Sequence, residues 1–231
     1  MRSFKMTVVA VATVALVAGC GGGFEDESAV AIEKASFDAI KSLKSLRIEG
    51  AITTDDQEIS LDLSTTTDGD CSGTIGLGEA SAEVLKIGED QWFKANEAFW
   101  LEQAGPQGEQ ISSLVGDKWV VLPAEQSDFT SFCDLDEFLD EIDNEDDEGP
   151  DPEKVGTEEV DGQEAVKLTD ETDEGDPVTV WVATDDEHYL LKLEVTEGEE
   201  PGVVTLSEFD EELDLDAPAE DDVVDLSQLA P

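Results

Sequence analysis

The chain has 231 residues, of which 60 are Asp or Glu and 12 are Lys or Arg, so its formal net charge at pH 7 is −48. This charge excludes a nucleic-acid footprint and a polybasic patch for anionic lipid, because both require clustered positive charge. The length suits one domain with a sizeable hydrophobic core.

The N-terminus has the pattern of an export signal. Arg2 and Lys5 precede an apolar run over residues 6–19. That run is shorter than the roughly 20 apolar residues that a helix needs to span a bilayer. A charged start followed by a short apolar run is typical of a cleaved signal peptide rather than a membrane-spanning helix.

The apolar run ends at the sequence Val17-Ala18-Gly19-Cys20. An aliphatic residue and two small residues before a cysteine resemble the lipobox of bacterial lipoprotein signals. The resemblance implies that residues 1–19 are removed and that Cys20 becomes an N-terminus carrying palmitate and diacylglycerol. We therefore expect the protein to be anchored by its lipid to the extracytoplasmic face of the cell membrane, since acyl chains must supply the binding that basic residues cannot. Residues 20–24 would form the lipidated tether and residues 25–231 one α+β domain.

Two cysteines remain after Cys20, namely Cys71 and Cys133. Outside the cytoplasm a lone pair of cysteines most simply forms a disulfide. Two buried free thiols are the alternative.

The hydrophobic period changes along the chain. Residues 25–46 have apolar side chains at helical spacing, and residues 124–143 return to that spacing. Between and after them, apolar and polar residues alternate as in strands with one solvated face. We expect strands at residues 47–53, 59–64, 71–77, 83–87, 91–95, 98–103, 118–122, 163–168, 178–183, 189–195 and 203–208. The acidic stretch 143–154 predicts an exposed loop, and residues 213–231 show no clear period. Helices on one side of an antiparallel sheet follow from this order.

Aromatic residues gather in the expected strands and in the second helix. They fill an ordinary core between sheet and helices, or they line an apolar cavity suited to an acyl chain. The residues assigned to such a cavity are Trp92, Trp119, Phe129, Phe132, Phe138 and Trp181.

Catalytic and metal-binding patterns are weak. His188 is the single histidine, and no nucleophile motif of the GxSxG kind occurs. Acidic loops that start at Asn144 and Asp170 resemble calcium loops, but their twelfth positions are Val155 and Trp181 instead of the closing glutamate. The sequence therefore predicts no enzyme, no cofactor and no specific metal site.

Three C-terminal segments behind a lipobox resemble one group of lipoproteins. These are residues 162–168 (GQEAVKL), 178–183 (VTVWVA) and 189–193 (YLLKL). Their succession is similar to that of LolA-like and LppX/LprG-like lipoproteins. The ending over residues 209–226 and the cysteine pair resemble uncharacterised actinobacterial lipoproteins of this kind. The resemblance implies a curved antiparallel half-barrel sheet with helices packed on one face, and several members of these families carry lipids between sheet and helices.

Two functions follow as expectations. The first is a membrane-anchored protein that binds or carries a hydrophobic ligand, such as a lipid, in a cavity between sheet and helices. The second is a scaffold or interaction module with a filled core, whose acidic surface or 143–154 loop meets a basic protein partner. The sequence leaves the ligand, the partner and the oligomeric state open.

Overall fold

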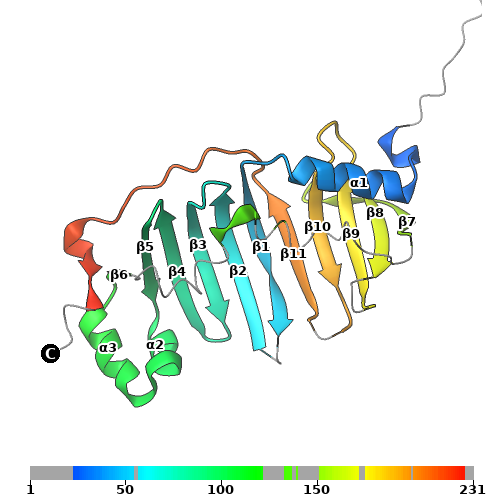
Figure 1. The fold of residues 1–231 in the computed structure, drawn as a ribbon. Coiled ribbons are helices and arrows are strands. Elements are labelled where there is room, and N and C mark those ends of the chain that lie inside the picture. The colour runs from blue at the N-terminus through cyan, green and yellow to red at the C-terminus, as the bar shows by residue number, and fades with distance from the viewer. Residues whose placement is uncertain are drawn as a thin grey trace, which may run out of the picture.

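A single large sheet dominates the structure, which is a computed structural model describing residues 23–54, 57–121, 133–136, 139, 151–171, 175–198 and 200–226. Its 12 strands follow one another across the sheet (Figure 1). Their order is β12 (Val223–Val224), β6 (Trp119–Val121), β5 (Asp90–Ala95), β4 (Ala80–Ile87), β3 (Cys71–Leu77), β2 (Gln57–Thr66), β1 (Ser45–Thr54), β11 (Gly202–Ser207), β10 (Leu190–Val195), β9 (Pro177–Ala183), β8 (Gln163–Glu171) and β7 (Glu153–Val160).

Two meanders build this sheet. The first runs from β1 to β6 and the second from β7 to β11, and they join where β1 pairs antiparallel with β11, with Ile48 opposite Leu206. Within each meander, consecutive strands pair antiparallel, whereas the short β12 pairs parallel with β6. The strands β6 and β7 follow one another in the chain but lie near opposite edges of the sheet.

The helices are short. The helix α1 (Ala29–Ile40) begins at Ser28, whose hydroxyl accepts a hydrogen bond from the Ala31 amide at 3.2 Å. The 3₁₀ turn η1 (Phe24–Asp26) precedes it. The helices α2 (Glu97–Ala104) and α3 (Gly108–Val115) follow β5 and are joined by η2 (Gly105–Gln107), and η5 (Glu220–Asp222) precedes β12. Among the described residues, no helix has the length and apolar character that crossing a membrane requires.

One predicted strand is wrong: residues 98–103 lie in α2. The Asn96 side chain caps this helix by accepting a hydrogen bond from the Phe99 amide at 2.9 Å. Phe99 and Trp100 are both buried. Consecutive residues of a strand point to opposite faces, whereas adjacent residues of a helix can share one buried side.

The other predicted strands coincide with observed ones to within a few residues. The first predicted helix shortens to α1, and most of the second, over 124–143, lies outside the described residues. The strand β7 was not predicted; it starts at Glu153, inside the expected acidic loop. All its residues except Val160 are exposed, so this edge strand lacks the alternation that marks a half-buried strand.

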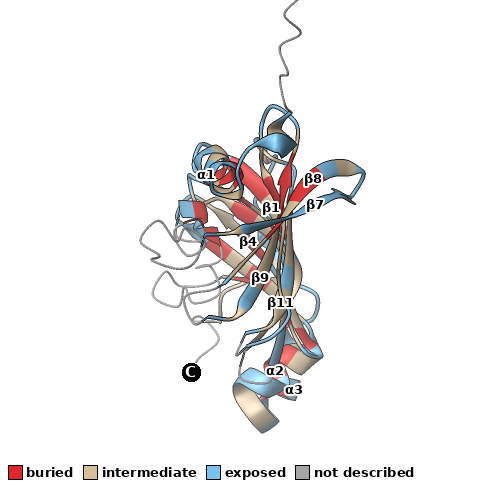
Figure 2. Cartoon of the chain, turned by 90° about the vertical axis from the view of Figure 1, so that its right-hand side faces the viewer, coloured by how far each residue is buried: buried red, intermediate tan, exposed pale blue. Residues whose placement is uncertain are grey.

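The two faces of the sheet differ in character. We call the face that carries α1, Cys133, Leu135 and Leu139 the apolar face, because its side chains form the main core clusters. Figure 2 shows α1 on this side of the sheet. The opposite face, here called the outer face, bears Arg47 and other charged residues. The structure is thus an α+β fold with a curved antiparallel sheet and helices packed on one face, as expected.

Candidate ligand-binding face

A continuous row of apolar positions crosses the apolar face. Side chains directly opposite one another in paired strands lie on the same face, so the ladder registers determine which residues are neighbours. Following the registers from β8 to β5 gives Leu168, Val180, Leu193, Val204, Gly50, Leu61, Ile75, Ala82 and Ala95. Every member is aliphatic except one glycine. We call this set the apolar row.

Parts of the apolar face are covered. Ile40 at the end of α1 packs in one buried cluster with Leu135, Leu139 and Ile48. Ile32, near the start of the same helix, packs against the β8 and β9 side of the sheet. These contacts explain the amphipathic pattern of α1, whose apolar side faces the sheet.

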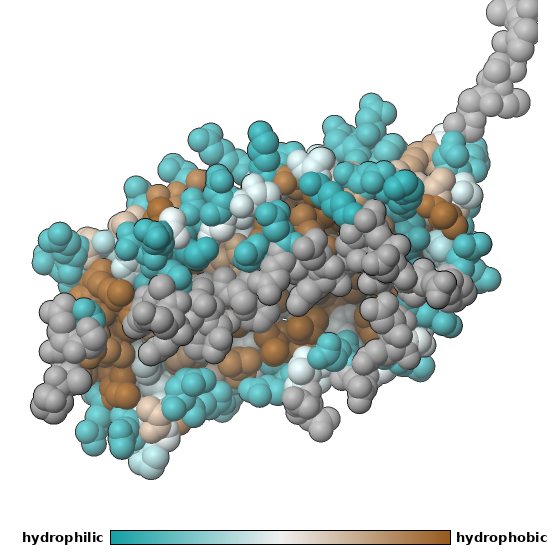
Figure 3. Space-filling model, viewed as in Figure 1, coloured by the Kyte–Doolittle hydropathy of each residue, from teal (hydrophilic) through white to brown (hydrophobic). Residues whose placement is uncertain are grey.

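Other parts of this face stay half-exposed. In the apolar row, Val180, Leu193 and Val204 are half-buried. The same holds for Ile52 and Ile59 in the neighbouring row, which pair with each other. Figure 3 shows patches of apolar side chains on this face, between hydrophilic rims. An accessible apolar strip on such an acidic protein is typical of a binding site.

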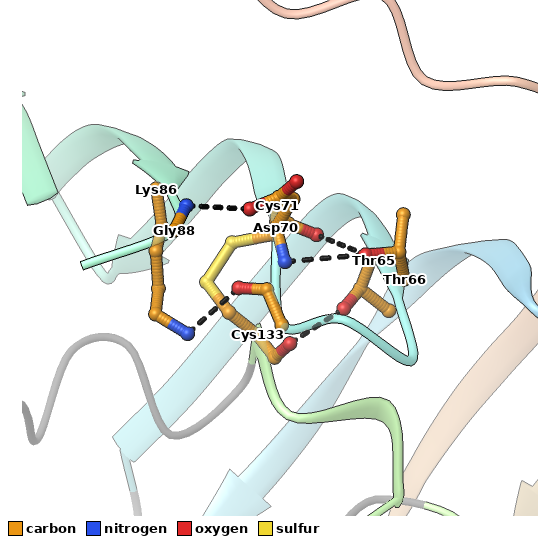
Figure 4. The surroundings of a disulfide bond; sticks show 8 residues. Thr65, Thr66, Asp70, Cys71, Lys86, Gly88 and Cys133 are labelled. Atoms are coloured by element: carbon orange, nitrogen blue, oxygen red, sulfur yellow. Dashed lines mark hydrogen bonds between the residues drawn. A yellow bond between two sulfur atoms is a disulfide. The ribbon is translucent and has the colours of Figure 1, made fainter. Parts of the chain in front are cut away.

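The disulfide predicted from the sequence is present and lies on this face. Cys71 at the start of β3 joins Cys133, with their Cα atoms 5.4 Å apart (Figure 4). The Thr65 hydroxyl donates a hydrogen bond to the Cys133 carbonyl at 2.7 Å, and Thr65 is fully buried. The disulfide and this hydrogen bond therefore fix Cys133, which lies between β6 and β7 in the chain, against β2 and β3.

The turn before Cys71 is also held in place. Lys86 Nζ donates to the Gly69 carbonyl at 2.7 Å, and the Gly88 amide donates to Asp70 Oδ1 at 2.6 Å. These bonds tie the β2–β3 turn to β4 and its following turn (Figure 4). The Lys86 ammonium is thus hydrogen-bonded to a backbone carbonyl and not to a group in the apolar row.

An aromatic group closes the β5 end of the apolar face. The Phe93 ring lies 5.6 Å from Phe99 and 5.3 Å from Trp100, measured between ring centres, and the latter two rings are 5.7 Å apart. All three belong to the buried cluster that contains Leu61 and Ile75 of the apolar row. Sequence reasoning did not assign Phe99 and Trp100 to the site; the Asn96 cap was the signal that could have placed them on a helix facing the core.

The three tryptophans assigned to a cavity lie on the other side of the sheet. Trp92 neighbours Phe93 in β5 and therefore points to the outer face. Trp119 lies beneath Lys94, whose ammonium is 5.1 Å from the ring centre, and Trp181 lies beneath Lys192. The apolar face thus does not include them, because residues one position apart in a strand alternate between faces. The assigned Phe129, Phe132 and Phe138, and also Cys20, lie outside the described residues.

Ion pairs cover the outer face. Arg47 Nη2 lies 2.8 Å from Asp62, and its Nη1 lies 3.3 Å from Glu208. The Asp62 carboxylate is the largest cause that raises the pKa of Arg47, with Glu208 and Glu49 adding to it. Other cations are paired in the same way, at Lys94–Glu83, Lys167–Glu158 and Lys192–Glu194. Each of these exposed pairs contributes little to stability. The pairing accounts for the arginine and lysine side chains on this face, so no binding role is needed to explain them.

His188 packs against an aromatic ring. Its imidazole stacks on the Phe24 ring, with ring centres 3.7 Å apart, next to the N-terminal end of the described chain. Within the described ranges, no group of three or more His, Cys, Asp or Glu residues is arranged to hold a metal ion. The features that define the candidate site are therefore its apolar surface and the aromatic group at its β5 end.

Comparisons with known proteins support this architecture. No family model and no curated protein sequence matches the chain. Among solved structures, the lipoprotein LppX of Mycobacterium tuberculosis is similar, with 21% identity, a TM-score of 0.53, and coverage of 83% of this chain and 100% of that one. LprF from Mycobacterium bovis is 16% identical, with a TM-score of 0.55 and coverage of 83% and 97%. The chain therefore has the curved-sheet fold of the mycobacterial lipoproteins LppX and LprF.

Proposed function

We propose that the protein binds or carries a hydrophobic ligand, a lipid with acyl chains, on its apolar face, and that it does so without catalysing a reaction. The half-exposed part of the apolar row carries this proposal. Adjacent strands lie about 4.8 Å apart, so the half-exposed stretch from Val180 in β9 to Gly50 in β1 extends over roughly 14 Å. One acyl chain spans half of a hydrocarbon core about 30 Å thick, hence about 15 Å, and fits along it. Each methylene that leaves water contributes about 0.8 kcal/mol.

The proposed place of action is the outer face of the cell membrane, with Cys20 as the acylated anchor. The described N-terminus supports a short link to that anchor. Lys154 Nζ donates hydrogen bonds to the carbonyls of Glu25 at 2.6 Å and Glu27 at 2.8 Å, which attaches the start of the domain to β7. From Cys20 to Gly23 the chain extends at most about 11 Å. A domain held this close to the bilayer surface is well placed to exchange lipid with it.

Adjacent residues of β9 provide a matched test. Val180 and Thr179 are both half-buried, but Val180 belongs to the apolar row and Thr179 lies on the outer face. Native mass spectrometry of the full-length chain carrying Cys20→Ala, purified without detergent, should reveal co-purifying lipid. Val180→Asn should reduce the lipid-bound fraction severalfold, because an unpaired amide would be buried against the acyl chain, and Thr179→Asn should leave it unchanged.

Thermal unfolding of both variants shows whether each is folded before the comparison is made. Absence of lipid from the parent protein, together with failure to bind added lipid, would reject the proposed function. Equal loss of lipid from the two variants would reject the apolar face as its site.

A further inference from the structure

The indole N–H of Trp100 is a buried hydrogen-bond donor without a partner. Trp100 is 5% exposed, and within the described residues its Nε1 atom makes no hydrogen bond. Leaving a buried donor unsatisfied destabilises the fold, whereas a phenylalanine at the same place would avoid that cost. An unpaired donor of this kind calls for an explanation.

The position of Trp100 relates it to the apolar face. Its ring lies 5.3 Å from Phe93 of β5, and it shares a buried cluster with Leu61, Ile75 and Ala82 of the apolar row. The indole combines a large apolar body with a single donor and no acceptor. Trp100 therefore brings one hydrogen-bond donor into the apolar cluster at the β5 end of this face.

We propose that Trp100 Nε1–H donates a hydrogen bond to an uncharged carbonyl oxygen of an acyl ester, in a ligand whose hydrocarbon chain lies on the apolar face. This inference rests on the proposed function and specifies the ligand class. The described residues that share this cluster with Trp100 are hydrophobic, so we take the acceptor to be neutral, because a carboxylate or phosphate buried there would need a cation to balance it. The lysines of β4 and β5 are already engaged: Lys86 bonds the Gly69 carbonyl, and Lys94 lies on the outer face against Glu83.

The indole N–H is covered in the structure, so an ester must displace the atoms that cover it. Binding of an ester then changes the environment of this one proton, while binding of a pure hydrocarbon does not give it an acceptor. A comparison of the two kinds of ligand therefore distinguishes a hydrogen bond from Trp100 from hydrophobic binding in general.

The experiment compares methyl palmitate with octadecane, a hydrocarbon of similar length without an oxygen. Both displace a fluorescent naphthylamine dye from the full-length chain carrying Cys20→Ala. The parent should bind methyl palmitate about tenfold more tightly than octadecane, since one hydrogen bond that satisfies a buried donor changes affinity by about this factor. Trp100→Phe should abolish the preference, because it should weaken the binding of methyl palmitate and leave the binding of octadecane unchanged. Trp92→Phe, on the outer face, is the matched control and should keep it.

Nuclear magnetic resonance of the Trp100 indole proton provides a test that needs no substitution at this residue. Methyl palmitate should move this resonance downfield and octadecane should not, which decides the matter even if Trp100→Phe does not fold. An unchanged resonance, or a preference for the ester that persists in Trp100→Phe, would overturn the assignment. If both probes bind equally to the parent, only the role of Trp100 fails; if neither binds, the proposed function fails with it.

Discussion

The ammonium of Lys192 lies 4.2 Å from the centre of the Trp181 ring, and Lys167 lies 4.8 Å from the same ring. Trp181 is 4% exposed although its strand turns it to the outer face. Two lysine side chains thus cover a large aromatic surface with their aliphatic stems and place their charges over its ring. The indole Nε1 donates to Glu158 Oε2 at 3.2 Å, which completes the group.

The contacts that Trp181 and Lys167 make with Glu158 predict that the contribution of this carboxyl to stability depends on pH. The hydrogen bond from Trp181 is the largest cause that lowers the pKa of Glu158, and Lys167 lowers it further. A carboxyl whose pKa is lower in the folded state stabilises the fold above its unfolded pKa, and the effect is lost as the pH falls through the folded value. Trp181→Phe should therefore raise the pKa of Glu158 toward its ordinary value, as measured by side-chain carboxyl titration in nuclear magnetic resonance.

Trp119→Phe is the control for this measurement, because Trp119 lies on the same face beneath Lys94 but near the opposite edge of the sheet. It should leave the Glu158 titration unchanged. A titration curve that does not move in Trp181→Phe would show that the indole bond contributes nothing in solution.

The sequence predicted the strands of the sheet well, because a half-solvated strand shows its alternation directly. Ile48 and Leu63 could be assigned to one face from spacing alone, and they are buried opposite each other. The edge strand β7 has no buried face over most of its length, so periodicity could not reveal it. The helix around Trp100 was mistaken for a strand because its short apolar run has the composition of either element.

The candidate site was harder to predict, since it depends on which face a residue occupies. Trp92 and Phe93 are neighbours in the chain and lie on opposite faces, so only the pairing register assigns Phe93 to the site. The pairing of Cys71 with Cys133 needed no such knowledge, because these are the two cysteines that follow Cys20 in the sequence. The apolar row itself depends on the joint between β1 and β11, a contact between residues far apart in the sequence.

The disulfide should contribute substantially to stability. Cys71 and Cys133 are 62 positions apart in the sequence. Closing a loop of that size lowers the entropy of the unfolded chain and so raises its free energy by about 4 kcal/mol at 25 °C. Replacing both with serine should lower the free energy of unfolding by about this amount in urea titrations. Thr65→Val removes the hydrogen bond to the Cys133 carbonyl but keeps the disulfide, and should cost about 1–3 kcal/mol. An unchanged urea midpoint in the double variant would contradict the entropic argument.

Gly50 should tolerate no side chain. A Cβ atom at this position would lie 2.1 Å from the Val203 carbonyl oxygen in the neighbouring strand. Since that oxygen belongs to the backbone, Gly50→Ala must push β1 away from β11 at the joint of the two meanders, and we expect a loss of about 1–3 kcal/mol. Ala51→Val alters the adjacent, outward-facing position and serves as the control, with a change within about 0.5 kcal/mol. Equal urea midpoints for the two variants would mean that the joint adapts without strain.

Added salt should stabilise the fold. With a net charge of −48, repulsion among carboxylates outweighs the few attractive pairs, and all the ion pairs around Arg47 and the lysines are partly solvated. Screening acts over about 10 Å at 0.1 M salt and weakens repulsion between carboxylates more than it weakens the pairs in direct contact. The thermal unfolding midpoint should therefore rise by several degrees between low and high NaCl at fixed pH. KCl at the same ionic strength should give the same rise, because the effect depends on screening and not on a bound sodium ion. A midpoint that stays constant or falls would mean that the carboxylates are spaced too widely for their repulsion to destabilise the folded state.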